Sequence, residues 1–494
     1  MPSAATVRVL PSETLGRVHP FIYGHFIEHL GRCIYGGVWA AERHETNRVA
    51  GYREDVLEAV KSLRVPVLRY PGGCFADGYH WKDGIGPRDK RPTVFDPAWK
   101  SDEPNAFGTD EFLRYCELLG ATPYLNANFG SGSVGEAVEW LRYCHDSPDT
   151  HWGGLRAANG RAKPYRVPIW GIGNEVCGSW EIGHTDAESY GRGFIEYAEA
   201  MKAVDPSIRL VAVGWDETIP DWSPQVVEVA GEHIDYLSLH HYVPGGEMKP
   251  MPGAEDLYYA IVASPLSTER KLRWLRQVIE DNLRVPRRIE IALDEWNVWL
   301  PSGGDLTQEY KLRDGLYAAG IFHALHRQCA SVTMANLAQL VNVLGAIRTD
   351  ERRIILTPIY WAFRLYGPRT GEVALRTEVE ADAYEPKPVG NITGLGAVPY
   401  LDVSATFSEE RATLFLAVVN RHWEEPIAAG LDIAPLVAKA EARVAELNGP
   451  SPLAENNFEA PNAVGLSETT FLVEGSCFEY GFPPHSATVL SIPV

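Results

Sequence analysis

The chain has 494 residues, of which 45% are hydrophobic and 22% charged, and its formal net charge is −20 at pH 7. This length exceeds one average domain and predicts two domains with a large buried core. Acidic residues (65) outnumber basic ones (45) and no cluster of Lys and Arg interrupts them, so a phosphate backbone or an anionic membrane would repel the chain. We therefore expect no nucleic-acid partner and no membrane partner.

The N-terminal stretch "MPSAATVRVLPSETLGR" lacks the apolar core of a secretory signal, and no run of 18 apolar residues occurs. The seven cysteines are odd in number and never spaced as Cys-x-x-Cys, which favours reduced thiols over disulfides or zinc. Both features predict a cytoplasmic protein.

The first element is a short strand pattern, "TVRVL" at residues 6–10, which no helical pattern follows. We expect residues 1–19 to form an N-terminal strand that joins a sheet domain at the other end of the chain.

The next stretch, "HFIEH" from His25 to His29, matches the His-x-x-Glu-His pattern of one class of zinc peptidases. That pattern binds zinc only on a helix, where positions i and i+4 share a face. The aromatic and apolar residues before Gly24 and the glycine at position 31 favour a strand instead, and no later helix offers a third ligand. We therefore expect no metal, with His25 and His29 as hydrogen-bonded core or rim residues.

Between residues 20 and 370, eight short apolar runs alternate with amphipathic helical patterns. One of these helices, "SVGEAVEWLRYCH", opens with a capping box from Ser133 to Glu136, and another is "STERKLRWLRQVIEDNL". Eight consecutive βα units predict an α/β fold, a (β/α)8 TIM barrel; a doubly wound open sheet is the alternative, but no Gly-x-Gly-x-x-Gly turn follows the first strand. The strand candidates are residues 21–28, 65–73, 122–130, 167–175, 208–216, 234–242, 289–297 and 332–340.

Residues 371–494 have a different character, with alternating strand patterns separated by Gly, Pro and Asn. Such a pattern predicts a C-terminal all-β sandwich domain. Its clearest strands are "YLDVSATF", "ATLFLAVVN", "TTFLVEG" and "SATVLSIPV".

Polar residues stand at the ends of the predicted barrel strands, where barrel enzymes carry their active sites. Two of them are carboxylates that close a strand, Glu175 in "GIGNE" and Glu295 in "LDEWN". A pair of carboxylates facing each other performs glycoside hydrolysis, one as acid/base and the other as nucleophile or water activator. The structural alternative is that arginines hold both as ion pairs. The 14 tryptophans and 22 tyrosines also favour a carbohydrate site, although most will belong to the core.

With these residues in view, the chain resembles the α-L-arabinofuranosidases of glycoside hydrolase family 51 over nearly its whole length. The motifs that carry the resemblance are "GHFIEHLGRCIYGG", "RYPGG", "DGIGP", "WGIGNE", "SLHHY", "DEWNVW", "AQLVNV" and "LNGPSP". The resemblance implies Glu175 as general acid/base, Glu295 as nucleophile and a retaining mechanism. It also implies that further residues bind the furanose or position the nucleophile: Glu28, Arg69, Asn174, Tyr242 and Gln339, with Trp99 near the mouth of the site.

One position departs from the family pattern, because Cys74 stands where many members have an asparagine that contacts the sugar. A thiol is a weak hydrogen-bond partner, so this contact is lost or made by a neighbour such as Asp77. The alternative is that Cys74 only packs. We keep Cys74 among the candidate substrate-binding residues.

For double displacement the pKa values of the two carboxyl groups must differ. We expect Glu175 to be the less well hydrogen-bonded of the two and to keep its proton until Glu295 is esterified. Tyr242 is expected to hydrogen-bond Glu295, and Asn174 to contact the sugar 2-hydroxyl. Because His240 and His241 are adjacent in a strand, they point to opposite faces and cannot ligate one metal. We expect no metal and no organic cofactor.

The expected activity is release of terminal non-reducing α-L-arabinofuranosyl residues from arabinose-containing oligosaccharides. The alternatives are an endo-β-glycanase or a β-xylosidase on the same barrel, and a non-catalytic carbohydrate-binding protein. The resemblance also implies a homo-oligomer, often a hexamer. The natural polysaccharide and the pH optimum stay open.

Overall fold

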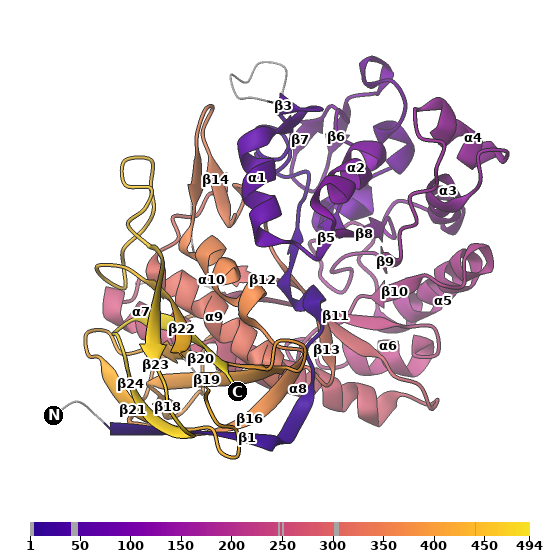
Figure 1. The fold of residues 1–494 in the computed structure, drawn as a ribbon. Coiled ribbons are helices and arrows are strands. Elements are labelled where there is room, and N and C mark those ends of the chain that lie inside the picture. Colours follow the sequence, from indigo (N-terminus) through magenta and orange to yellow (C-terminus); the bar gives the residue numbers. More distant parts are fainter. Residues whose placement is uncertain (1–3, 41–47, 246–247, 249–250, 301–305, 440) are drawn as a thin grey trace.

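A closed barrel of eight parallel strands forms the larger part of the molecule (Figure 1). The computed structural model describes residues 4–40, 48–245, 248, 251–300, 306–439 and 441–494. The predicted barrel is confirmed, and each strand candidate overlaps one barrel strand. Around the barrel these are β2 (Gly24–Phe26), β5 (Val67–Tyr70), β8 (Thr122–Ala127), β9 (Ile169–Ile172), β10 (Arg209–Ala212), β11 (Tyr236–Val243), β12 (Glu290–Val298) and β13 (Val332–Leu337).

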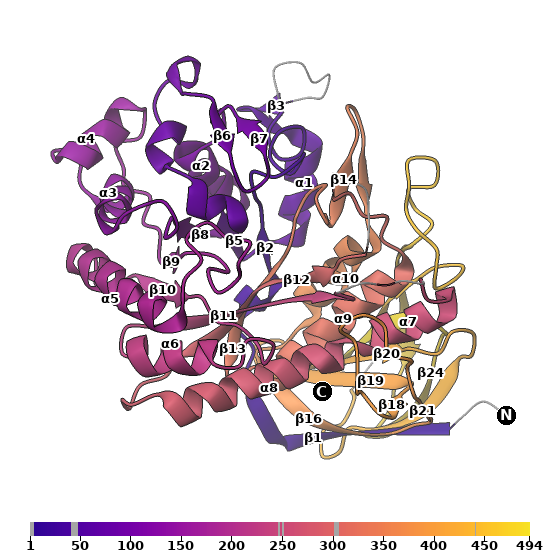
Figure 2. The same cartoon turned by 180° about the vertical axis from the view of Figure 1, so that it is seen from behind.

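Helices follow the barrel strands and cover the outside of the barrel (Figures 1 and 2). Two predicted helices are present: α3 begins after Ser133, whose side chain accepts from the Glu136 amide at 3.2 Å, and α8 buries its apolar stripe. The helices are α1 (Glu54–Leu63), α2 (Thr109–Leu119), α3 (Val134–His145), α4 (His151–Ala158), α5 (Ala187–Val204), α6 (Trp222–Ala230), α7 (Ala254–Ala263), α8 (Pro265–Asn282), α9 (Leu312–Arg327) and α10 (Pro358–Tyr366).

The first barrel strand is shorter than predicted. Pro20–Tyr23 form a 3-10 turn, η1, with proline at its start, and only Gly24–Phe26 pair as β2. The "HFIEH" stretch therefore runs from a strand into a turn and not along a helix. His25 packs against Phe363, and His29 bonds Glu103 at 2.8 Å and Tyr70 at 2.9 Å. Both histidines belong to the core, which removes the zinc-peptidase interpretation.

The long connection between β5 and α2 lies over the end of the barrel where the strands finish. It contains three 3-10 turns, η2 (Cys74–Gly78), η3 (Trp81–Gly84) and η4 (Arg88–Lys90), and a hairpin of β6 (Val94–Asp96) and β7 (Ser101–Glu103). Trp99 lies in the turn of this hairpin, so the hairpin brings it to the strand ends. Three further small sheets pair β3 (Arg48–Val49) with β4 (Tyr52–Arg53), β14 (Ile347–Thr349) with β15 (Ile354–Leu356), and β17 (Ala383–Tyr384) with β18 (Val398–Pro399).

The C-terminal strands form one continuous nine-stranded sheet, in the order β23-β22-β25-β20-β19-β16-β1-β21-β24. Apolar residues of β22, near one edge of the sheet, share one core with residues of β21 and β24 at the other edge. The sheet therefore curls around a core formed by its own side chains. The predicted sandwich is thus a curled single sheet. Its strands are β16 (Val373–Glu380), β19 (Leu401–Ser408), β20 (Thr413–Asn420), β21 (Ile427–Asp432), β22 (Glu441–Asn448), β23 (Gly465–Leu472), β24 (Cys477–Phe482) and β25 (Ser486–Pro493).

The N-terminal strand β1 (Ala4–Arg17) lies within this sheet, antiparallel to β16 and parallel to β21 (Figure 1). The division of the chain at residues 19 and 370 stays a prediction. A buried ionic cluster ties the sheet to the barrel helices: Asp402 on β19 accepts from Arg327 of α9 at 3.0 Å and from Arg421 at 2.8 Å. Across the described residues, every helix is too short or too polar to cross a bilayer.

Candidate active site

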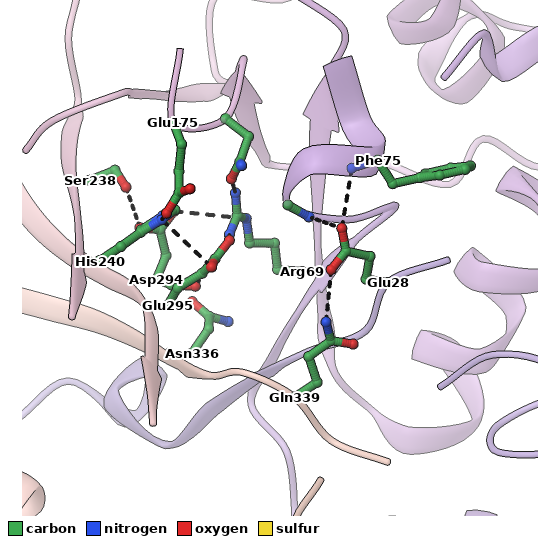
Figure 3. Close-up of polar contacts among 12 residues, drawn as sticks. Glu28, Arg69, Phe75, Glu175, Ser238, His240, Asp294, Glu295, Asn336 and Gln339 are labelled. Carbon is green, nitrogen blue, oxygen red and sulfur yellow. Dashed lines mark hydrogen bonds and ion pairs between the residues drawn. The ribbon is translucent and has the colours of Figure 1, made fainter. Parts of the chain in front are cut away.

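Glu175 and Glu295 come together at the ends of β9 and β12. One oxygen of each carboxylate and one ring nitrogen of His240 all lie within 4.8 Å of one another. Figure 3 shows the three side chains converging from separate segments of the barrel. The predicted approach of the two carboxylates is therefore present.

Glu175 follows β9 with a backbone φ of 44°, in the left-handed region that a side chain rarely occupies. Its Oε1 accepts from Nδ1 of His240 at 2.7 Å, and its Oε2 accepts from the indole N–H of Trp180 at 2.8 Å. Burial raises the pKa of Glu175, but His240 and Trp180 outweigh burial and hold it below its usual range.

Glu295 is held by different donors. Arg69 donates to its Oε1 at 2.7 Å, and Tyr242 donates to its Oε2 at 2.7 Å, so the predicted Tyr242 contact is present. Arg69 forms an ion pair with Glu295, whereas the ion-pair partner of Glu175 is His240. The alternative in which arginines hold both carboxylates as structural pairs is therefore wrong.

A local irregularity of β12 turns two adjacent acids toward the barrel interior. Ser238 and His240 of β11 are two residues apart, yet they face Ala292 and Glu295, which are three apart. Such a bulge breaks the alternation of a strand. As a result Asp294 contacts Ser238 and Tyr124 inside the barrel while its neighbour Glu295 also reaches the site.

His240 belongs to the site, although no catalytic or binding role was predicted for it from the sequence. Burial lowers its pKa, whereas the carboxylates of Glu295, Asp294 and Glu175 raise it, and the net result is a pKa of about 10. The surrounding carboxylates therefore favour a proton on His240. Each glutamate accepts two hydrogen bonds from side chains, so the expected difference in their hydrogen bonding is absent. The expectation that Glu175 keeps its own proton stays a prediction.

Glu28 organises a second group beside Arg69 (Figure 3). Its Oε1 accepts from the backbone of Gly73 and Phe75 and from the Trp99 indole at 3.0 Å, and its Oε2 accepts from Gln339 at 2.8 Å. Burial and the nearby Glu295 raise the pKa of Glu28 to about 7. Three predicted site residues, Glu28, Trp99 and Gln339, thus lie together.

The glycines of "RYPGG" let the backbone pass between these groups. A Cβ on Gly72 would lie 2.9 Å from Oε1 of Glu28, and one on Gly73 would lie 2.9 Å from Oε1 of Glu295. Any side chain at either position would displace a carboxylate.

Asn174 connects Arg69 to a further acid. Its Oδ1 accepts from Arg69 at 2.7 Å, and its amide donates to Glu181 at 3.0 Å. Its backbone N–H donates to Asp77 at 2.7 Å. Asp77 is fully buried and also accepts from the backbone amides of Phe129 and Gly130, so it holds these loops in place.

Cys74 opens η2 and is half-buried. Its sulfur lies within 4.8 Å of a carboxylate oxygen of Glu175 and one of Glu181, so the thiol faces the catalytic group. Burial raises the pKa of Glu181 to about 8, and the neighbouring acids Asp77 and Glu175 add to that rise. Its surroundings therefore favour the neutral form of Glu181, which no sequence pattern indicated.

Replacing Glu181 by glutamine should stabilise the protein at pH 8 more than at pH 5. The ordinary pKa of this carboxyl is 4.5 and the folded value is about 8, so the native state holds an extra proton between these values. Stability contributed by that proton is complete below pH 4.5 and is lost as pH rises toward 8, whereas glutamine does not titrate. We expect the gain from the substitution to be about 3.5 kcal/mol larger at pH 8. Denaturant unfolding at both pH values measures it.

The matched control is Glu199→Gln at an exposed position of α5. We expect it to change stability equally at both pH values. A Glu181→Gln effect of the same size at pH 5 and pH 8 would contradict a neutral Glu181.

Exposed aromatic rings surround the carboxylates. Trp180 is 57% exposed although its indole binds Glu175, and its ring lies 5.9 Å from that of Trp215. Trp299 packs edge-on against Tyr242 at 5.3 Å and is also exposed. Rings placed in this way offer stacking faces for sugar units beside the catalytic pair.

The residues that sequence reasoning missed share a cause. His240 and Asp294 lie in the quoted motifs "SLHHY" and "DEWNVW", but only the bulge in β12 and the curvature of the barrel make them neighbours. Trp180 and Glu181 lie in the loop after β9, where no periodic pattern exists. The motif "SLHHY" is the one available signal, since it puts a histidine next to a predicted strand end.

Known families match both parts of the chain. A model described as "Alpha-L-arabinofuranosidase 1 domain" matches residues 59–251, and one described as "Alpha-L-arabinofuranosidase C-terminal domain" matches residues 294–486. Alpha-L-arabinofuranosidase C of Emericella nidulans is 36% identical over 99% of this chain and 97% of its own length. The intracellular exo-alpha-(1->5)-L-arabinofuranosidase 1 of Bacillus subtilis is 34% identical over 82% of this chain and 83% of its own length.

Solved structures agree with these matches. The α-L-arabinofuranosidase of Thermotoga maritima in complex with arabinose superposes with a TM-score of 0.90 and 41% identity, over 99% of this chain and all of that one. A family 51 α-L-arabinofuranosidase from Bifidobacterium longum gives a TM-score of 0.91 at 28% identity, over the whole of both chains. With this fold, this pair of carboxylates and these relatives, the chain belongs to the α-L-arabinofuranosidases of glycoside hydrolase family 51.

Proposed function

We propose that this glycoside hydrolase releases terminal non-reducing α-L-arabinofuranosyl residues from arabinose-containing oligosaccharides with retention of configuration. The observation that carries the proposal is the approach of the Glu175 and Glu295 carboxylates to within 4.8 Å. Retaining enzymes hold their carboxyl groups about 5 Å apart, whereas inverting enzymes leave about 6.5–9.5 Å for a water molecule. The spacing favours direct attack by one carboxylate.

In the proposed mechanism Glu295 attacks C1 of the sugar, and the glycosidic oxygen leaves with a proton delivered through Glu175. Arg69 and Tyr242 hold both Glu295 oxygens, so one rotamer faces the sugar and little reorganisation is needed. Water then attacks C1 of the glycosyl-enzyme while Glu175 accepts its proton. The ester bond to Glu295 breaks, and the enzyme is restored.

The remaining candidate residues are proposed to recognise the furanose. Glu28, with a pKa near 7, and the amide of Gln339 offer acceptors and donors to sugar hydroxyls, and Asn174 is proposed to contact the 2-hydroxyl. Trp99 is proposed to line the mouth of the site, and Cys74 to contact the sugar weakly. These roles follow from position and chemistry.

A panel of 4-nitrophenyl glycosides tests the activity against the alternatives. We expect hydrolysis of the α-L-arabinofuranoside at least about 100-fold faster, as kcat/KM, than of the β-D-xylopyranoside or of β-glucans. Predominant xylosidase or endo-glucanase activity would replace the proposal, and the absence of all hydrolysis would favour a binding protein. Proton NMR of the first-formed sugar should show the α-anomer, and an inverted anomer would remove the nucleophile role from Glu295.

We further propose a cytoplasmic location and a homo-oligomeric state. The location is supported by the Bacillus subtilis relative, which is named an intracellular enzyme. The oligomeric state rests on the family resemblance alone. Light scattering of the purified protein would measure it.

A further inference from the structure

His240 lies among three carboxylates beneath the proposed site of proton transfer (Figure 3). Its Nδ1 donates to Oε1 of Glu175 at 2.7 Å and is 3.6 Å from Oε2 of Glu295. Its Nε2 is 3.5 Å from Oδ1 of Asp294. Arg69 is a further charged group nearby, and its two terminal nitrogens bind Glu295 and Asn174. The ring is 5% exposed, so it exchanges protons through these neighbours more readily than with water.

Asp294 fixes the far side of the ring. It accepts from the Tyr124 hydroxyl at 2.8 Å and from the Ser238 hydroxyl, and it lies 3.8 Å from Nε of Arg69. Burial raises the pKa of Asp294, but Arg69 and His240 outweigh burial and hold it at about 2. A carboxylate that stays ionised on the Nε2 side keeps the ring oriented and favours a second proton on Nδ1.

We propose that His240 is a positioning residue that stores the catalytic proton on Nδ1 in the resting enzyme and supplies it through Glu175. The inference rests on the proposed hydrolase function and adds the location of the proton. When Glu295 attacks C1, the proton on Nδ1 of His240 passes to Glu175, and the electron pair of the breaking glycosidic C–O bond takes it from there, which leaves Glu175 as a carboxylate and His240 neutral. In the second step the attacking water gives its proton to Glu175 and from there to Nδ1, while Glu295 leaves as a carboxylate.

The charges around His240 change during the reaction, and this change determines when the proton leaves Nδ1. Three negative groups hold the imidazolium in the resting state, and the one on Glu295 disappears when the glycosyl ester forms. The lost charge lay 3.6 Å from Nδ1, so its loss lowers the pKa of His240. This happens at the step in which the glycosidic oxygen accepts a proton. Hydrolysis restores the charge and the proton together.

The principal test is the pH dependence of kcat/KM for His240→Asn on 4-nitrophenyl α-L-arabinofuranoside. The asparagine amide can take the place of Nδ1 as a donor to Glu175, but it does not titrate. The alkaline limb of the kcat/KM profile is set by His240 in the wild type and by Glu175 in the variant. We expect this limb to lie at least about one pH unit lower in the variant. Loss of activity by the same factor at every pH, with the limb unmoved, would assign His240 a structural role and overturn the proposal.

The matched control is His241→Asn on the same strand. His241 is buried on the opposite face, where its Nδ1 contacts Thr268 at 2.8 Å, and burial lowers its pKa to about 3, so it is neutral throughout the assay range. We expect the control to keep the wild-type alkaline limb. A wild type that hydrolyses no arabinofuranoside would defeat the proposed function, whereas an active wild type with an unmoved limb in His240→Asn would defeat only this inference.

A second measurement does not depend on the folding of the His240 variant. The ¹⁵N resonances of His240 can be followed with pH in the wild type and in Glu295→Gln. We expect an imidazolium at pH 8 in the wild type and a lower titration midpoint in Glu295→Gln, in which the charge at 3.6 Å is absent. A neutral His240 at pH 8 in the wild type would overturn the proposal.

Discussion

Replacing Glu295 by alanine should lower kcat by at least about 10⁴-fold on every arabinofuranoside, activated or not. Alanine removes the atom that forms the bond to C1, and no other carboxylate replaces it, because Glu175 faces His240 and Glu28 is held by four donors. Added azide should occupy the vacated space and restore cleavage of an activated substrate, with an azide product of inverted configuration. Stopped assays and NMR of that product measure both results.

Glu295→Gln is the matched control for folding. Its amide keeps the shape of the side chain and an acceptor for Arg69, so the variant should fold like the wild type and be as inactive as the alanine variant. Similar melting temperatures together with loss of turnover would separate chemistry from stability. Activity of either variant within about tenfold of the wild type would remove Glu295 from the role of nucleophile.

Replacing Glu175 by alanine should give losses that depend on the leaving group. A natural alcohol leaving group needs a proton, so hydrolysis of arabino-oligosaccharides should fall about 10²–10⁴-fold, the range that general acids supply. A 2,4-dinitrophenolate leaves without a proton, so formation of the glycosyl-enzyme should remain fast with that substrate. Its hydrolysis is then slow because the base is missing, and a burst of dinitrophenol should precede a slow steady state.

Azide should accelerate this steady state and give a product of retained configuration, since it attacks the glycosyl-enzyme and not the substrate. The matched control is Glu188→Gln on the exposed side of α5, which should behave as the wild type. An equal loss on oligosaccharides and on the dinitrophenyl substrate would contradict the acid/base role.

The fold was largely predictable because its strands and helices carry strong local patterns. Each barrel strand is an apolar run, and α8 shows the stripe of Leu272, Leu275 and Ile279 that faces its neighbours. The first strand was predicted too long because Pro20 begins a 3-10 turn inside an apolar run that reads as extended. The curled single sheet could not be told from two packed sheets, since inward and outward residues alternate in both.

The residues at the strand ends were predictable, but the contacts between their side chains were not. Glu28, Arg69, Asn174, Glu175, Tyr242, Glu295 and Gln339 all lie at one end of the barrel because parallel strands all finish there. Cys74 and Trp99 reach the same region through the β5–α2 connection. The donors to each carboxylate could not be predicted, because a linear pattern of polar residues does not say which donor faces which carboxylate.

The amino-acid sequence by itself determined the barrel, the sheet-rich C-terminal part, the identity of the two glutamates and the family, because each of these depends on local periodicity or on short contiguous motifs. Only the tertiary structure decided that Asp294 and Glu295 both point inward, that His240 lies between Asp294 and Glu175, and that burial raises the pKa of Glu181. The physical reason is that protonation and side-chain direction depend on burial and on charges only a few ångströms away. Those neighbours come from strands that are far apart in the chain, and a one-residue bulge is enough to change which of them meet.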